Sequence, residues 1–206
     1  MHLKNIEPPV KGNTDGLILA GGRGQRFNNQ DKGLIPFHGV TLAEHAIARL
    51  TPQVNHVLVS ANRHLNDYQR LNINCIQDIF PNYPGPLAGI HAALKNSESD
   101  WLASIACDTP CFPMDYVEKL SAKLTCSDSL VAVAKSNNRL QNVFMLVHKT
   151  LFNSLDEFIK QGERKAQIWL KQHNPVIVNF NAPTHAFYNI NTPEELAKIE
   201  KLRCND

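Results

Sequence analysis

The sequence feature that most constrains the fold is a short apolar run that ends in a glycine-rich, basic loop. Residues 16–20 have the apolar character of a buried strand, and the chain then continues as Gly-Gly-Arg-Gly-Gln-Arg. Glycines lack the Cβ atom that would keep a phosphate group away from backbone N–H groups. Three cations in and after the loop supply the charge that attracts a triphosphate: Arg23, Arg26 and Lys32. The segment predicts a nucleotide site at a strand end; the alternative is a glycine-rich turn with surface arginines.

Two common phosphate-binding loops do not fit this segment. The Walker pattern has Ser or Thr after Gly-Lys, whereas Lys32 is followed by Gly-Leu. The dinucleotide pattern needs a third glycine where this chain has Phe27. What remains is Leu-Ala-Gly-Gly at residues 19–22 and Asp-Lys-Gly-Leu at residues 31–34. This pair resembles the signature of nucleotidyltransferases, which activate sugars and cofactors with a nucleoside triphosphate.

Length and composition indicate one enzyme-sized domain. The chain has 206 residues, 43% of them hydrophobic, and a net charge of +2. Its cations are dispersed, so we expect no nucleic-acid surface, and no apolar stretch has the length of a membrane span. We interpret residues 1–15 as a loose polar leader without the apolar centre of a signal peptide, and residues 16–206 as a single domain. Five scattered cysteines are consistent with a cytoplasmic protein whose thiols are reduced.

Apolar runs alternate with helical patterns along the chain, which predicts an α/β sandwich with a mostly parallel sheet. Two segments have the pattern of a capping box at a helix start, one from Thr41 to Glu44 and one from Thr192 to Glu195. The expected strands are residues 16–20, 54–60, 73–77, 101–107, 129–134, 143–147, 176–180 and 185–190. The expected helices are residues 41–50, 86–95, 114–124, 151–160, 163–171 and a last one from residue 192.

Polar groups follow several of the predicted strands. The glycine loop, Ser60, Asp78 and Asp108 each come at or just after a strand end. Ligands of parallel sheets bind beyond the carboxyl ends of the strands. We therefore expect these groups to share one cleft.

The two carboxylates in this group, Asp78 and Asp108, suggest separate roles. Asp108 could bind Mg²⁺, which takes few protein carboxylates and completes its shell with water and phosphate oxygens; alternatively it only caps the turn into Thr-Pro. Asp78, together with Ser60 and Asn62, could contact the base or the ribose; alternatively Asp78 is a turn residue.

Two further motifs lie near predicted helix starts. Tyr-Pro-Gly-Pro-Leu-Ala-Gly at residues 83–89 places Gly85 at a helix entry, where an anion is favoured; a rigid Pro-Gly turn is the alternative. Asn189 and Asn191 are two residues apart, so a strand would point both side chains to one side. They could then bind a metal-bound phosphate or an acceptor. Helix capping explains the sequence from Thr192 onward but does not explain Asn189.

These blocks together resemble the bacterial molybdenum cofactor guanylyltransferases. Leu-Ala-Gly-Gly with Asp-Lys-Gly is shared by many nucleotidyltransferases, whereas three longer blocks are more specific: Tyr-Pro-Gly-Pro-Leu-Ala-Gly, Cys-Asp-Thr-Pro and Asn-x-Asn-Thr-Pro-Glu-Glu-Leu. The resemblance implies a Rossmann-like three-layer sandwich of the nucleotide-diphospho-sugar transferase type. It also implies a Mg²⁺-dependent reaction in which GMP passes from GTP to the phosphate of Mo-molybdopterin and pyrophosphate leaves. Molybdoenzymes and their chaperones would be partners in delivery of the cofactor.

The resemblance also implies roles for single residues. Catalytic roles would fall to Lys32, Asp108, Asn189 and Asn191, with Asp108 holding the metal. Residues 162–164 would lie toward the pterin. The nucleotide would be bound by Leu19, Ala20, Gly21, Gly22, Arg26, Lys32, Ser60, Asn62, Asp78, Gly85 and Asp108.

The chain departs from the family pattern at two places. Phe27-Asn28 replaces a frequent Met-Gly, and Ser60 stands where an asparagine is frequent. A hydroxyl offers less hydrogen bonding than an amide, which puts a base contact at position 60 in question. Rival interpretations are a relative that uses CTP or a sugar phosphate, and a nucleotide-binding accessory protein without catalysis. The presence of Lys32 and Asp108 argues against the second rival.

Overall fold

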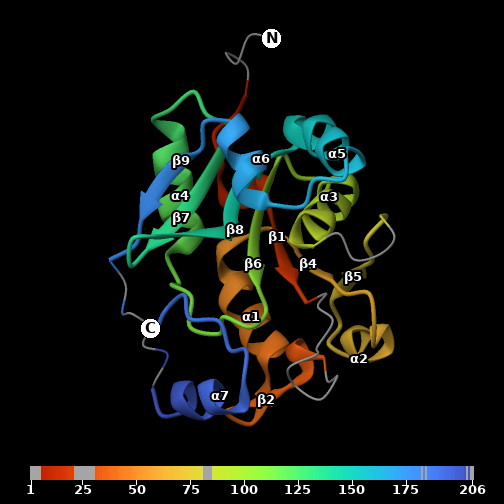
Figure 1. Ribbon diagram of the computed structural model, residues 1–206, viewed down its shortest axis with the longest axis vertical. Coiled ribbons are helices and arrows are strands. Elements are labelled where there is room, and N and C mark those ends of the chain that lie inside the picture. Colours follow the sequence, from red (N-terminus) through yellow and green to blue (C-terminus); the bar gives the residue numbers. More distant parts are fainter. Residues whose placement is uncertain are drawn as a thin grey trace.

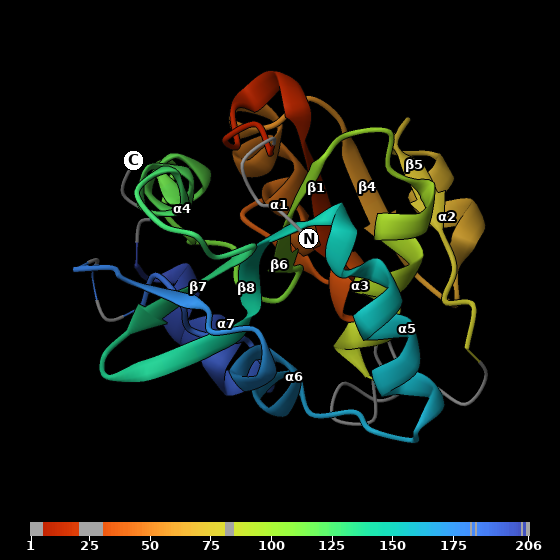
Figure 2. The same ribbon diagram turned by 90° about the horizontal axis from the view of Figure 1, so that it is seen from above.

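The structure is a computed structural model that describes residues 6–20, 31–80, 85–181, 183, 185–202 and 204. Helices cover both faces of a central sheet, so the described chain has three layers (Figures 1 and 2). Its structure confirms the predicted α/β sandwich.

The sheet contains seven strands of the described chain, in the order β5-β4-β1-β6-β8-β7-β9. Strand β8 runs antiparallel to both of its neighbours, and the other pairs in the sheet are parallel. The prediction of a mostly parallel sheet is therefore confirmed. The strands are β1 (Thr14–Leu19), β4 (Val57–Ser60), β5 (Asn74–Ile76), β6 (Trp101–Ala106), β7 (Val131–Ser136), β8 (Arg139–His148) and β9 (Val176–Asn179).

Helices α1, α2 and α4 cover one face of the sheet, and α3, α5 and α6 cover the other (Figure 2). Thr41 and Glu44 form the predicted capping box at the start of α1, and Thr192 and Glu195 form the one at α7. Among the described residues, no helix has the length and apolar character needed to cross a membrane. The helices are α1 (Leu42–Leu50), α2 (Leu65–Gln69), α3 (Pro86–Asn96), α4 (Tyr116–Thr125), α5 (Phe152–Lys160), α6 (Ala166–Gln172) and α7 (Pro193–Glu200).

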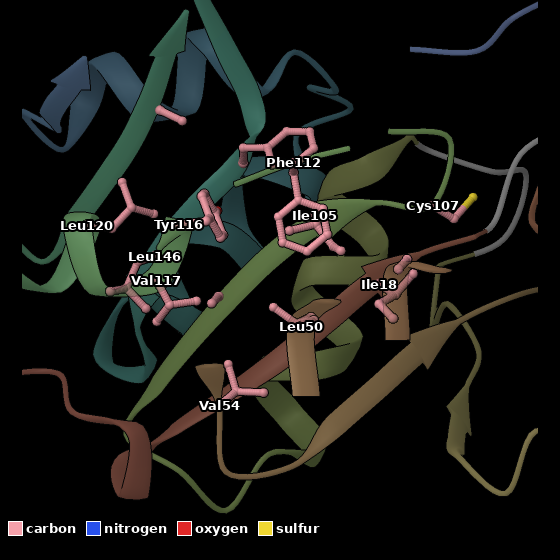
Figure 3. Close-up of a cluster of buried hydrophobic side chains, with 14 of the residues drawn as sticks. Ile18, Leu50, Val54, Ile105, Cys107, Phe112, Tyr116, Val117, Leu120 and Leu146 are labelled. Atoms are coloured by element: carbon pink, nitrogen blue, oxygen red, sulfur yellow. The ribbon is translucent and has the colours of Figure 1, made fainter. Parts of the chain in front are cut away.

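The two faces of the sheet bury separate apolar cores. Successive residues of a strand point to opposite faces. Fully buried Ile18 accordingly packs in one core with Leu50 and Tyr116, while its neighbour Leu17 packs in the other with Trp169 (Figure 3 shows the first core). Because both faces are covered, the strands can be apolar throughout, as the sequence indicated.

A third, smaller cluster lies at the carboxyl end of the sheet. There α7 and the hairpin of β2 (Pro36–Phe37) and β3 (Val40–Thr41) come together, and Phe37, Ile190 and Ile199 are buried among them (Figure 1). A disulfide joins Cys111 to Cys204 in the same region. The expectation of reduced thiols is therefore wrong for this pair.

Two predicted segments differ from the structure. Residues 14 and 15 are not part of a loose leader, because they are buried and begin β1; before them, the carbonyl of Glu7 accepts a hydrogen bond from Trp101 Nε1 at 3.0 Å. Residues 185–190 do not form a strand. Their apolar side chains are buried, but the backbone turns, and the N–H of Ile190 donates to the carbonyl of Asp108 at 2.8 Å instead of joining a ladder.

Gly89 allows α3 to approach the sheet closely. A Cβ at this position would lie 2.6 Å from Leu19 Cδ2 and 2.7 Å from Ser60 Oγ. We expect Gly89→Ala to lower the free energy of unfolding by about 1–2 kcal/mol, since overpacking outweighs the better helix propensity of alanine. Urea unfolding measures the effect. Gly12→Ala is the control, because among the described residues no heavy atom beyond its chain neighbours lies within 4 Å of its Cβ position. Equal effects of the two substitutions would contradict the prediction.

Candidate active site

The carboxyl ends of four parallel strands form one row. In register, Leu19 at the end of β1 pairs with Ser60 of β4 on one side and with Ala106 of β6 on the other, and Ser60 pairs with Ile76 of β5. The chain segments that follow therefore emerge along one edge, as the sequence predicted. Neighbouring strands are about 4.8 Å apart, so this row spans roughly 14 Å from β5 to β6.

Lys32 connects three distant segments at the β6 end of the row. Its Nζ donates to Asp108 Oδ2 at 3.0 Å and to Asn191 Oδ1 at 2.8 Å. The Lys32 side chain is 22% exposed and that of Asp108 is 13% exposed. Ion pairs are stronger in such partly buried positions than in open water. The structure thus brings together three of the four residues that the sequence predicted to be catalytic.

Asp108 keeps one carboxylate oxygen without a hydrogen bond. Within the described chain, its Oδ1 is buried and has no hydrogen-bond partner, while its Oδ2 accepts from Lys32. A buried carboxylate oxygen is costly unless a donor or a cation satisfies it. The described residues contain no group of three or more His, Cys, Asp or Glu that could hold a metal ion. The Asp108 carboxylate could hold an ion such as Mg²⁺, which needs only one or two carboxylates when phosphates and water complete its shell.

The two asparagines before α7 turn to different partners. Asn189 Oδ1 accepts from Thr109 Oγ1 at 3.1 Å, while Asn191 Oδ1 accepts from Lys32. The predicted strand that would have aligned these side chains is absent from this described segment. Glu195 holds Asn191 in place, because its Oε2 accepts from the Asn191 N–H at 2.7 Å.

Asp78, beyond the end of β5, lies in a hydrogen-bonded cluster. Asn62 Nδ2 donates to Asp78 Oδ2 at 2.8 Å, Ser60 Oγ donates to Oδ1 at 3.2 Å, and the Asp78 N–H donates back to Asn62 Oδ1 at 2.9 Å. Burial raises the pKa of Asp78 above its ordinary value, and the hydrogen bonds from Asn62 and Ser60 oppose that rise. Each carboxylate oxygen can accept a second hydrogen bond, so the cluster can still bind a ligand with two donors.

Gly85 precedes α3 with a φ of 92°, which favours glycine. A Cβ on Gly85 would lie 3.8 Å from the carbonyl oxygen of Arg164, so the loop before α6 comes close to this helix entry. The predicted nucleotide-binding residues Gly21, Gly22 and Arg26 lie outside the described residues, and so does Arg23. Their roles stay predictions.

A pocket beside Asn191 was not predicted from the sequence. It has a volume of about 540 Å³ and lies between the β7–β8 hairpin and the segment before α7. None of the sequence motifs includes this hairpin, whose residues 136–142 read Ser-Asn-Asn-Arg-Leu-Gln-Asn. The lining includes Arg139, Gln141, Tyr188, Asn189, Asn191 and Glu195.

Comparison with known proteins identifies the family of this chain. Residues 16–176 match the family model described as a MobA-like NTP transferase domain. The chain is 39% identical over 192 residues to the molybdenum cofactor guanylyltransferase of Shewanella halifaxensis, covering 93% of this chain and 96% of the relative. It is 41% identical over 194 residues to that of Bordetella pertussis, covering 92% and 98%. The chain therefore belongs to the molybdenum cofactor guanylyltransferase family of nucleotidyltransferases, which confirms the family that the motifs indicated.

Solved structures agree at the level of the fold. A molybdopterin-guanine dinucleotide biosynthesis protein A from Archaeoglobus fulgidus superposes with a TM-score of 0.76 at 23% identity, covering 91% of this chain and 97% of that one. A CMP:2-keto-3-deoxy-manno-octonic acid synthetase in complex with CTP superposes with a TM-score of 0.71 at 15% identity, covering 92% and 98%. These structures confirm the nucleotidyltransferase type of sandwich.

The unpaired oxygen of Asp108 leads to a prediction for nucleotidyl transfer. Asp108→Asn keeps the side-chain volume but removes the charge, so we expect turnover to fall by roughly 10²-fold or more in the presence of Mg²⁺. Pyrophosphate release measures the loss. Asp100→Asn makes the same chemical change in a surface ion pair with Lys149 and serves as the control. A folded Asp108→Asn protein with nearly full turnover would disprove a metal-binding role.

Proposed function

We propose that this protein transfers GMP from GTP to the phosphate of Mo-molybdopterin, with Mg²⁺ as the cofactor. The observation that carries the proposal is the contact of Lys32 with both Asp108 and Asn191 at the end of β6. Family membership supports the reaction, and the row of strand ends supports the placement of the nucleotide. Delivery of the product to molybdoenzymes or their chaperones, and a cytoplasmic location, stay predictions.

The base would bind at the β5 end of the row. Guanine presents its ring N1–H and its exocyclic amine side by side, and a carboxylate can accept from both. Asp78 fits this role because Asn62 and Ser60 orient its carboxylate while each oxygen keeps accepting capacity. Adenine and cytosine do not offer that pair of donors, so their binding would leave the half-buried carboxylate poorly satisfied.

The triphosphate would then cross β1 toward β6. Leu19 and Ala20 lie at the centre of the row, where backbone groups can face the phosphates. The Lys32 ammonium would stabilise the charge that builds on the departing pyrophosphate. Mg²⁺ bound through Asp108 would neutralise the phosphates and polarise the phosphorus–oxygen bonds.

The acceptor would approach from the pocket on the other side of Asn191. An oxygen of its phosphate forms the new bond to the α-phosphorus as the bond to pyrophosphate breaks, so one P–O bond is exchanged for another. Asn191 lies between this pocket and Lys32, and it can orient the incoming phosphate through its amide. Asn189 lines the same pocket and is held by Thr109. The alignment of the two substrates accounts for much of the catalysis in such a reaction.

Nucleotide choice tests the proposal against the rival activities. We expect GTP to be preferred over CTP and ATP, and Asp78→Ala to lose roughly 10- to 100-fold of that preference, because hydrogen bonds to a charged group are removed. Pyrophosphate release with each nucleotide, in the presence of Mo-molybdopterin, measures it. Asp67→Ala on the exposed side of α2 is the control. A wild-type preference for CTP would move the protein to the cytidylyl relatives, and binding without turnover would indicate an accessory protein.

The acceptor pocket has its own test. Arg139 lines it from the exposed end of β8 and could pair with the anionic acceptor. We expect Arg139→Ala to raise the KM for Mo-molybdopterin roughly fivefold, as suits an exposed ion pair, while the KM for GTP stays the same. Arg70→Ala, an exposed arginine that pairs with Asp67, should change neither constant. An unchanged acceptor KM in Arg139→Ala would place the anion elsewhere.

A further inference from the structure

Tyr68 makes a buried hydrogen bond that none of the sequence motifs indicated. Its side chain is fully buried, and its hydroxyl donates to Asp31 Oδ1 at 2.6 Å. The same oxygen accepts from the N–H of Gly33 at 3.1 Å. Asp31 is itself 5% exposed and caps the short 3₁₀ helix Lys32–Leu34. Two donors thus fix the carboxylate of Asp31, the residue directly before Lys32, and one of them is the N–H of Gly33, the residue directly after it.

We propose that Tyr68 and Asp31 form a positioning unit for Lys32. The tyrosine hydroxyl fixes the Asp31 carboxylate, and this carboxylate fixes the backbone on which Lys32 lies. The lysine ammonium reaches the phosphates from that backbone. The inference rests on the proposed function, since it concerns how Lys32 acts in turnover. Neither Tyr68 nor Asp31 needs to contact a substrate in this role.

The packing around the hydroxyl supports this role. A Cβ on Gly33 would collide with the Tyr68 hydroxyl, so the absence of a side chain there lets the tyrosine reach Asp31. Burial raises the pKa of Asp31, whereas the hydrogen bonds from Tyr68 and Gly33 act in the opposite direction and stabilise the carboxylate. A hydrogen bond in such an apolar interior is costly to break, which keeps the geometry around Lys32 defined.

The position of Tyr68 in the chain extends the inference to the base side. Helix α2 begins directly after His64, whose left-handed φ of 53° turns the chain away from the end of β4. That loop carries Asn62, which orients Asp78. The hydrogen bond of Tyr68 to Asp31 therefore connects two segments of the site. One is the loop after β4, which carries the proposed base contacts, and the other is the 3₁₀ helix Lys32–Leu34, which carries the proposed phosphate contact.

A purely structural tyrosine would stabilise the fold without affecting the chemistry, and the chain offers a matched control. Tyr116 is also fully buried, and its hydroxyl donates to the backbone carbonyl of Ser104 at 2.8 Å, within the core under α4. Tyr116→Phe removes a comparable buried hydroxyl away from Lys32. We expect both Tyr→Phe variants to lower the melting temperature.

The experiment compares the steady-state kinetics of these variants. For Tyr68→Phe we expect kcat to fall about tenfold while the KM for GTP stays within about twofold, because the base contacts remain. Tyr116→Phe should keep its kcat when it is assayed well below its melting temperature. Asp31→Asn retains the oxygen that accepts both hydrogen bonds, so it should recover most of the turnover that Asp31→Ala loses.

A double-mutant cycle shows whether the effect passes through Lys32. If it does, adding Tyr68→Phe to Lys32→Ala costs no further turnover. Equal losses of kcat in Tyr68→Phe and Tyr116→Phe, or additive losses in the cycle, would overturn the inference. If Tyr68→Phe does not fold, the comparison of Asp31→Asn with Asp31→Ala tests the inference instead. Equal losses of kcat in these two variants would overturn the inference. A wild-type protein without GTP turnover would instead refute the proposed function.

Discussion

The site depends on one ammonium group held between two segments that are far from it in the sequence. Lys32 reaches Asp108, 76 residues away, and Asn191, 159 residues away. The Lys32–Asp108 pair is partly buried, and the loss of hydration offsets much of the attraction between its charges, so this contact matters mainly because it defines a geometry. The backbone at each of its three members is held by a separate hydrogen bond. Beside Lys32, the N–H of Gly33 donates to Asp31; the N–H of Asn191 donates to Glu195; and the N–H of Ile190 donates to the carbonyl of Asp108.

The sheet turns this local contact into an extended site. Parallel pairing aligns the ends of β5, β4, β1 and β6, so Asp78 and Asp108 emerge from opposite ends of one row. The strand direction changes beyond β6, where β8 runs antiparallel to β6 and forms a hairpin with β7. The turn of that hairpin lies at residues 137–138, and the pocket beside Asn191 extends from there. The single reversed strand thus provides a wall on the side where the acceptor would enter.

Local patterns in the sequence predicted much of this fold, and contacts between distant residues account for what they missed. The capping boxes at Thr41 and Thr192 span four residues each and could be read directly from the sequence. The short helix α2 carries no such signal, and Tyr68 meets Asp31 across 37 residues, a pairing that no spacing encodes. Residues 185–190 are apolar enough to suggest a strand, but Phe187 packs against Phe144 and Phe180 without any partner in a ladder. The direction of β8 follows from the two-residue turn at residues 137–138 that joins it to β7, and not from its composition.

Ser60, one of the two departures from the family pattern, packs closely against α3. Ser60 Oγ lies so close to α3 that the facing helix position, Gly89, has no room for a Cβ. The nearby Asn62 instead supplies an amide: it both donates to Asp78 and accepts from its N–H, while Ser60 adds a weaker contact at 3.2 Å. The orientation of the Asp78 carboxylate therefore depends mainly on the amide of Asn62, while the short side chain of Ser60 accompanies the close approach of α3 to the sheet.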